Sequence, residues 1–190
     1  RKCIGRSVEQ VRASLFDFTA FTVLSKLLIG ASVYTLHISS SNLSEIGCKN
    51  LLRLFETNEV YRAFLVDVHS QSSVKLLIEL SYHVRSVEIM QGNARFETSS
   101  NYLLGARDVD WASVILDMFS GKLAKLRIST SYEAYLTKRS INCILETLPK
   151  LNKNISFESS CNPSRTEVNY VNDNVTIIVA DRLLKIEIRR

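Results

Sequence analysis

Few residues of this chain have the types and spacing that catalysis or metal binding requires. The three histidines, His37, His69 and His83, are far in sequence from any cysteine, and none belongs to an H-E-x-x-H motif. Protein zinc sites are normally built from such clusters at short spacings. The sequence also has no G-x-S-x-G, no P-loop and no G-x-G-x-x-G, and only six glycines that could line a phosphate loop. We therefore predict no catalytic residue, no metal ligand and no cofactor.

Asp108 and Asp110 form a close pair of carboxylates that could serve a cation or an acid–base step. They also stand where an apolar helical stripe begins, at Trp111. Carboxylates in the first turn of a helix are stabilised by the helix dipole. We therefore interpret the pair as a helix start and Trp111 as a core residue.

The four cysteines, Cys3, Cys48, Cys143 and Cys161, include no C-x-x-C pair. Cys48 and Cys143 fall on the predicted apolar faces of helices, where a free cysteine acts as a small hydrophobic residue. This usage favours a reduced, intracellular protein, cytoplasmic or nuclear. The alternative is an extracellular leucine-rich-repeat-like binding domain, which would bring Cys143 and Cys161 within disulfide reach or carry a glycan at Asn42.

Composition excludes several partner classes. The 190 residues are 46% hydrophobic and 23% charged, as in ordinary folded domains. The net charge of +5 comes from lysines and arginines that are scattered, whereas a nucleic-acid-binding domain concentrates them on one face. No apolar run reaches the ~18 residues of a membrane span. We predict neither nucleic acid nor membrane as a partner, and because the chain starts at Arg1 we expect a missing upstream segment.

Two apolar patterns alternate along the chain. The spacing V-x-x-L-x-I occurs in "VYTLHI" from Val33, "VRSVEI" from Val84, "LAKLRI" from Leu123 and "LLKIEI" from Leu183. Between these stretches, apolar residues recur at i, i+3, i+4 and i+7, which is typical of an amphipathic helix. We predict helices at 13–28, 44–56, 73–81, 109–119 and 140–148, strands at 33–38, 61–68, 84–89, 124–129, 154–158, 175–179 and 183–188, and a loop at 159–173.

Strands that alternate with helices predict βαβ units and a mostly parallel sheet. In a doubly wound α/β domain with a small-molecule site, strands are covered on both faces and read as continuous apolar runs. Here Leu36 and Ile38 alternate with polar residues, so one face of the sheet should be open. We therefore predict an α/β fold, an irregular leucine-rich-repeat-like βα solenoid closed by a C-terminal β-hairpin. It would form a single domain over residues 13–190, preceded by a basic tail over residues 1–12.

Four stretches resemble the F-box-associated domains of nematode F-box proteins: "RKCIGRSVEQVR" from Arg1, "LFDFTAFTVLSKLLIGASVYTLHI" from Leu15, "WASVILDMFSGKLAKLRIS" from Trp111 and "NVTIIVADRLLKIEI" from Asn174. They are similar, in turn, to the end of an F-box, the opening helix and strand, an internal helix–strand unit and the closing hairpin. The resemblance implies the substrate-recruiting part of a cullin-type ubiquitin ligase. An upstream F-box would bind a Skp-type adaptor, and this domain would hold the target protein.

The resemblance also implies that recognition falls to the open face of the sheet, in a non-catalytic protein–protein interaction. By the predicted register, the outward-facing and therefore partner-binding residues are Thr35, His37, Ser39, Leu65, Asp67, Ser86, Glu88, Lys125, Arg127, Ser156 and Glu158.

Overall fold

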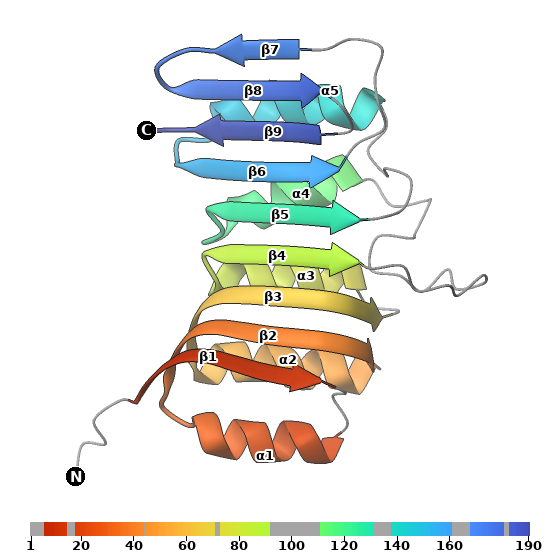
Figure 1. Cartoon of the computed structure of the whole chain (residues 1–190), viewed down its shortest axis with the longest axis vertical. Helices are drawn as coiled ribbons and strands as arrows, with labels where there is room; N and C mark the ends of the chain where they lie inside the picture. The colour runs from red at the N-terminus through yellow and green to blue at the C-terminus, as the bar shows by residue number, and fades with distance from the viewer. Residues whose placement is uncertain are drawn as a thin grey trace.

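A computed structural model of the chain describes residues 6–14, 18–43, 45–70, 73–91, 111–130, 138–160, 168–180 and 183–190. Strands and helices alternate along them (Figure 1). The elements are β1 (Ser7–Ser14), α1 (Phe18–Leu28), β2 (Ser32–Leu43), α2 (Glu45–Thr57), β3 (Glu59–Ser70), α3 (Ser73–His83), β4 (Ser86–Gln91), α4 (Trp111–Ser120), β5 (Lys125–Thr130), α5 (Lys138–Thr147), a 3₁₀ turn (Leu148–Lys150), β6 (Ile155–Ser160), β7 (Val168–Val171), β8 (Val175–Ala180) and β9 (Leu183–Ile188).

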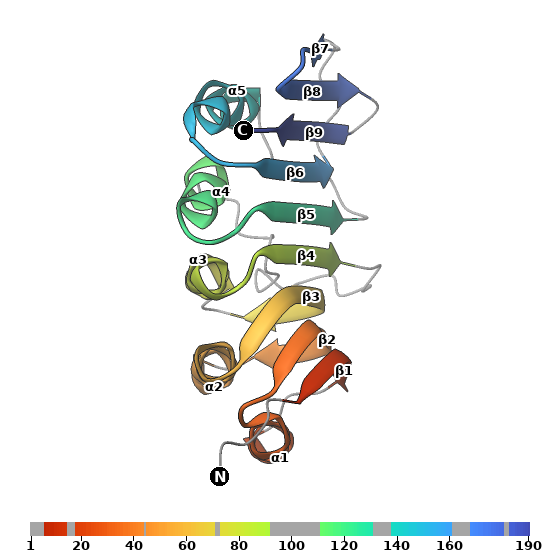
Figure 2. The ribbon, with the colours of Figure 1, turned by 90° about the vertical axis from the view of Figure 1, so that its left-hand side faces the viewer.

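The described strands form one sheet in the order β1-β2-β3-β4-β5-β6-β9-β8-β7. Strands β1 to β6 run parallel, each beside the one before it, and β9, β8 and β7 complete the sheet in antiparallel fashion. The helices lie on one face of this sheet (Figure 2). The predicted α/β fold with a mostly parallel sheet and a C-terminal hairpin is confirmed. The doubly wound alternative is wrong for the described strands, because the order of β1 to β6 never reverses and the helices share one face.

The V-x-x-L-x-I spacing marks the residues that each unit buries beneath the sheet. The first apolar residue is buried where the chain enters the sheet, and the next two share a strand face because they are two residues apart. Neighbouring units align these residues in register, for example Leu36 with Ala63 and Ala63 with Val87. The buried sets are Val33, Leu36 and Ile38; Val60, Ala63 and Leu65; Val84, Val87 and Ile89; and Leu123, Leu126 and Ile128.

The amino-terminal prediction is wrong. Residues 7–14, which we expected as the end of a basic tail and the start of a helix, form β1 at one edge of the sheet. The physical reason is the same spacing: Val8, Val11 and Ala13 pair with the three buried residues of β2. Helix α1 begins later than predicted, at Phe18. At the other edge, β7 lies in the segment 159–173 that we predicted to be a loop.

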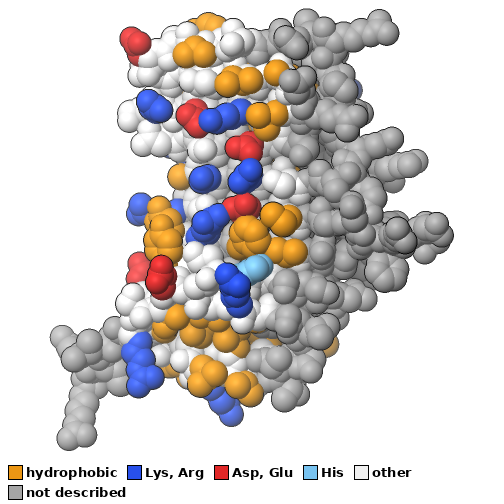
Figure 3. All heavy atoms as spheres, viewed as in Figure 1, with side chains coloured by type: hydrophobic (Ala, Val, Ile, Leu, Met, Phe, Trp, Pro, Cys, Tyr) orange, Lys and Arg blue, Asp and Glu red, His pale blue; other side chains and the backbone are white. Residues whose placement is uncertain are grey.

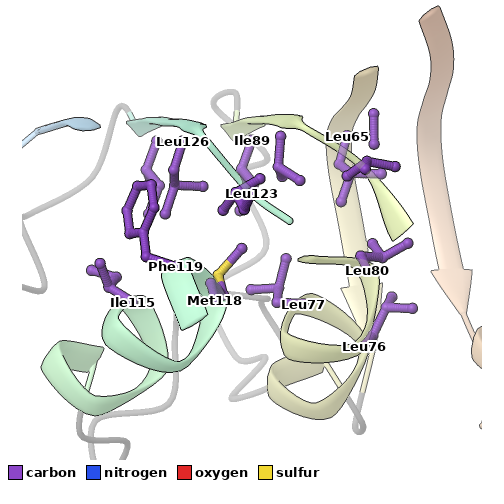
Figure 4. Packing of buried hydrophobic residues seen from close by; sticks show 14 of the residues in the cluster. Leu65, Leu76, Leu77, Leu80, Ile89, Ile115, Met118, Phe119, Leu123 and Leu126 are labelled. Carbon is purple, nitrogen blue, oxygen red and sulfur yellow. The ribbon is translucent and has the colours of Figure 1, made fainter. Parts of the chain in front are cut away.

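The core lies between the sheet and the helices. Leu65, Ile89 and Leu126 point from the strands toward Leu77 on α3 and Phe119 on α4 (Figure 4). The rings of Phe119 and Phe157 meet edge to face, with centroids 6.2 Å apart. Aromatic pairs of this geometry stabilise a core beyond the area they bury.

The predicted helix stripes are confirmed for most positions of α2 to α5. The stripe predicted for α1 is wrong, because Val23 and Leu27 are 53% and 71% exposed and the buried positions lie one residue away from the predicted stripe, at Phe21 and Leu28.

Cys48 is buried as predicted, but Cys143 is exposed. It lies two residues after the buried Ile141, and positions two apart on a helix do not share a face. The side chain of Trp111, and Asp108, Asp110, Cys3 and Cys161, lie outside the described residues.

Backbone hydrogen bonds join the turns of successive units. The amide of Leu123 donates to the carbonyl of Ser81 at 3.1 Å, and the amide of Lys125 donates to the carbonyl of Arg85 at 3.0 Å. Gly121 permits this approach, because a Cβ there would stand 2.9 Å from the Ser81 oxygen. The units are therefore held to one another at the turns as well as along the strands.

Candidate protein-binding face of the sheet

The sheet face opposite the helices, called the open face below, carries side chains that the strand register places in line (Figure 3). One line crosses the sheet from β1 to β9, each residue paired with the next: Arg12, His37, Phe64, Glu88, Arg127, Glu158 and Lys185. A parallel line contains Gln10, Thr35, Arg62, Ser86, Lys125, Ser156 and Glu187. The first line mixes cations, anions and aromatic rings, and of these residue types arginine and the aromatic residues are enriched at protein interfaces.

Most of the predicted residues occupy this face. Those with outward positions in the two lines are Thr35, His37, Ser86, Glu88, Lys125, Arg127, Ser156 and Glu158. Lys125 and Arg127 are exposed, whereas Thr35, His37, Ser156 and Glu158 are half-buried. Ser86 and Glu88 are only 8% and 7% exposed. Whether these residues bind a partner stays a prediction.

The register predicted for β3 is wrong. Leu65 is fully buried, and Arg62 and Phe64 occupy the outward positions in its place. A shift of one residue exchanges the two faces of a strand. In "VYRAFLVDV" the buried residue that would have revealed the repeat is Ala63, which is too small to stand out. The side chains of Ser39 and Asp67 lie outside the described residues.

A chain of ion pairs crosses the middle of the open face. Glu88 accepts from Arg62 on β3 and lies 3.7 Å from Nη1 of Arg127 on β5. Nε of Arg127 in turn lies 3.0 Å from Oε1 of Glu158 on β6. Because two guanidinium groups flank it, the Glu88 carboxylate is satisfied although it is almost covered. The four charged side chains in this part of the face therefore pair with one another.

A depression of about 370 Å³ opens over β1, β2 and β3. Its lining contains Thr35 and His37 of the predicted set together with Glu9, Gln10, Arg12, Tyr34, Arg62 and Phe64, which sequence reasoning missed. Glu9, Gln10 and Arg12 come from β1, which was not predicted as a strand, Arg62 and Phe64 come from β3, whose register was wrong, and Tyr34 comes from β2. The V-x-x-V-x-A spacing from Val8 and the V-x-x-A-x-L spacing from Val60 were the signals that could have placed those of β1 and β3.

Aromatic contacts hold the side chains of the depression and its rim in fixed positions. Tyr34 and Tyr61 stack with ring centroids 5.0 Å apart and planes 8° from parallel. His37 meets Phe64 edge to face at 4.7 Å. The guanidinium of Arg62 lies 5.9 Å from the centre of the Phe64 ring. Such stacking and cation–π contacts limit the side-chain freedom that a ligand would otherwise have to remove.

The environment of His37 disfavours its charged form. Burial lowers the pKa of its imidazole from 6.5, and the nearby Arg12 guanidinium lowers it further. The folded chain therefore binds fewer protons than the unfolded chain between the lowered pKa and about 6.5. Stability that this residue contributes is present above that window and is lost as the pH falls through it.

We expect the substitution Arg12→Gln to raise the pKa of His37 while leaving it below 6.5, because the charge is removed and the burial remains. The NMR titration of the imidazole resonances measures this shift directly. Arg53→Gln, an equal change of charge on the exposed side of α2, is the matched control and should leave the titration unchanged. An unchanged pKa in Arg12→Gln would show that burial alone depresses the value.

A search of the described residues finds no group of three or more histidine, cysteine, aspartate or glutamate side chains placed to hold a metal ion. Among the same residues, no helix is both long and apolar enough to cross a membrane. In comparisons with known proteins, no family model matches the chain, and neither a curated protein sequence nor a solved structure matches it. The similarity to F-box-associated domains therefore stays a prediction from the sequence patterns quoted above.

Proposed function

We propose that this chain is a non-catalytic protein-binding domain that holds a partner protein on its open face. The observation that carries the proposal is the asymmetry of the sheet. The helices lie on one face (Figure 2), and no described helix covers the other face, on which the strand register aligns the side chains. Sheets built from repeated units commonly expose such a surface to partners. Arginine and aromatic side chains, which this face carries, are enriched at protein interfaces.

The leucine-rich-repeat-like character of the fold is part of this proposal. It is supported by the buried apolar sets, which recur in β2, β3, β4 and β5 and align from unit to unit. It is also supported by the stacking of the turns, in which the backbone of one unit hydrogen-bonds to the next. Each unit buries its apolar residues against its own helix and its neighbours, as in solenoid proteins.

We further propose that the domain is the substrate-recruiting part of an F-box protein, on the strength of the sequence resemblance. In that role no bond is made or broken by the chain itself. An F-box elsewhere in the protein would bind a Skp-type adaptor, and the open face would hold the target so that its lysines reach the ubiquitin-charged enzyme. The contribution of the domain would be proximity and orientation.

The binding face is tested by site-specific photo-crosslinking in cells. A photoreactive amino acid replaces Lys125, which is exposed on the open face, and in a matched variant it replaces Lys75, which is exposed on α3. We expect discrete protein adducts from position 125 and few from position 75. Equal adduct patterns at the two positions would contradict the assignment of the open face.

The ligase role is tested separately. The full-length protein, expressed from its own gene, should co-purify with a Skp-type adaptor, and the adducts from position 125 should accumulate when the proteasome is inhibited. If adducts form but the adaptor does not co-purify, the ligase role is contradicted and the proposal of a protein-binding domain remains.

A further inference from the structure

The charged groups of the open face are unevenly paired. Across β4 to β9, Glu88, Arg127 and Glu158 form ion pairs, and Lys185 pairs with Glu187 at 2.9 Å. At the β1 end of the face, Arg12 forms no ion pair with any residue that the structure describes. Arg12 at the depression and Lys125 on β5 are therefore the open-face cations without an ion pair among the described residues, and the charge of Lys125 acts on the carboxyl of Glu187.

The same depression contains polar atoms that lack hydrogen bonds. Nε2 of His37 and Nε of Arg62 are buried, and neither has a hydrogen-bond partner among the described residues. A buried polar atom without a partner costs free energy. Arg62 is nevertheless held in place, because its guanidinium contacts both Glu88 and the Phe64 ring. A carboxylate that entered the depression would meet oriented donors. Glu9 is the only residue of the described lining whose negative charge would repel it.

Apolar surface adjoins these cations. Phe64 is half-buried in the lining, and the stacked rings of Tyr34 and Tyr61 are 56% and 44% exposed. On this part of the open face a histidine lies among basic and hydrophobic side chains (Figure 3). A ligand that fits would carry negative charge and an apolar group close together.

We propose that the depression binds a short acidic segment of a partner protein, with an aspartate or glutamate carboxylate beside Arg12 and Arg62 and an apolar side chain against Phe64 and Tyr34. The inference rests on the proposed function, because it gives the chemistry of the partner that the open face holds. Hydrogen bonds between a guanidinium and a carboxylate are among the stronger ones in proteins. The contact is local, and it would fix one anchor of a larger interface.

The charge pattern favours an acidic peptide over a nucleic acid. A polynucleotide would continue across the sheet, where it would meet the carboxylates of Glu88, Glu158 and Glu187. A phosphate backbone needs a continuous basic track. Outside the depression, the cations Arg127 and Lys185 alternate with Glu88 and Glu158 along one line, so they form no continuous basic track. The depression matches a few acidic residues.

The test uses the full chain and a fluorescein-labelled peptide in which glutamates flank a single leucine, measured by fluorescence anisotropy. A matched peptide with glutamines in place of the glutamates and a labelled oligothymidylate serve as the other probes. We expect the acidic peptide to bind at least about tenfold more tightly than the glutamine peptide, and more tightly than the oligonucleotide. Arg12→Gln should weaken the acidic peptide by about fivefold to tenfold, the loss of a charge-assisted hydrogen bond. Arg53→Gln, with the same charge change on α2, should leave its affinity unchanged.

Three results would overturn the inference: equal affinity for the two peptides, equal weakening by Arg12→Gln and Arg53→Gln, or tighter binding of the oligonucleotide. A competition experiment with the acidic peptide distinguishes failure of this inference from failure of the proposed function. If the acidic peptide in excess fails to suppress the adducts from position 125, the open face holds a partner but its anchor is elsewhere. If adducts never form while the peptide binds, the proposed function fails and the claim of a protein partner fails with it.

Discussion

The substitution Phe157→Ala is expected to lower the free energy of unfolding by about 3–5 kcal/mol, the usual cost of removing a large aromatic side chain from a core. Phe157 is fully buried on β6 and packs edge to face against Phe119. It is also paired with Leu126 on one side and Ile186 on the other, so it joins the parallel strands to the closing hairpin. The cavity would therefore weaken both parts of the sheet. Urea unfolding followed by circular dichroism measures the change.

A matched control is Tyr170→Ala on β7, an aromatic side chain that is 51% exposed. Its loss should cost under about 1 kcal/mol, as for other surface positions. Equal destabilisation by the two substitutions would contradict the packing described for β6. A second transition in the Phe157→Ala denaturation curve would show that the hairpin unfolds separately from the parallel units.

The substitution Glu88→Ala is expected to destabilise the fold by about 1–3 kcal/mol. It would leave Arg62 and Arg127 facing each other across β4 without the carboxylate that both contact. Removal of one partner from a fully buried ion pair costs about 3–5 kcal/mol. The cost here is reduced because the two arginine side chains are 36% and 47% exposed and water screens their repulsion. Chemical denaturation at low and high ionic strength measures both the loss and its screening.

Glu158→Ala provides the comparison, because its carboxylate also pairs with Arg127 but its side chain is 34% exposed. It should cost under about 1 kcal/mol. Added salt should reduce the loss in Glu88→Ala by screening the two guanidinium groups. A loss in Glu88→Ala no greater than that in Glu158→Ala, at either salt concentration, would show that the central carboxylate is not required to separate the arginines.

The sequence was least informative where its local signals were ambiguous. Residues 61–66 are mostly apolar, so alternation alone did not show whether Leu65 or Phe64 faces the core. Residues 7–14 contain a strand pattern that charged and polar side chains partly conceal. These two errors hid Arg12, Arg62 and Phe64, which are the residues that complete the depression beside Thr35 and His37.

The sequence by itself determined the alternation of strands and helices, the parallel sheet, the closing hairpin and most of the buried residues. These features follow from local periodicity, because side chains repeat every two residues on a strand and every 3.6 on a helix. Only the tertiary structure decided which side chains of the open face meet. Arg62 and Glu88 are 26 residues apart in the chain, and they become neighbours because β3 and β4 pair in one particular register. The depression likewise exists because three strands bring separate segments together, and no single stretch of sequence contains it.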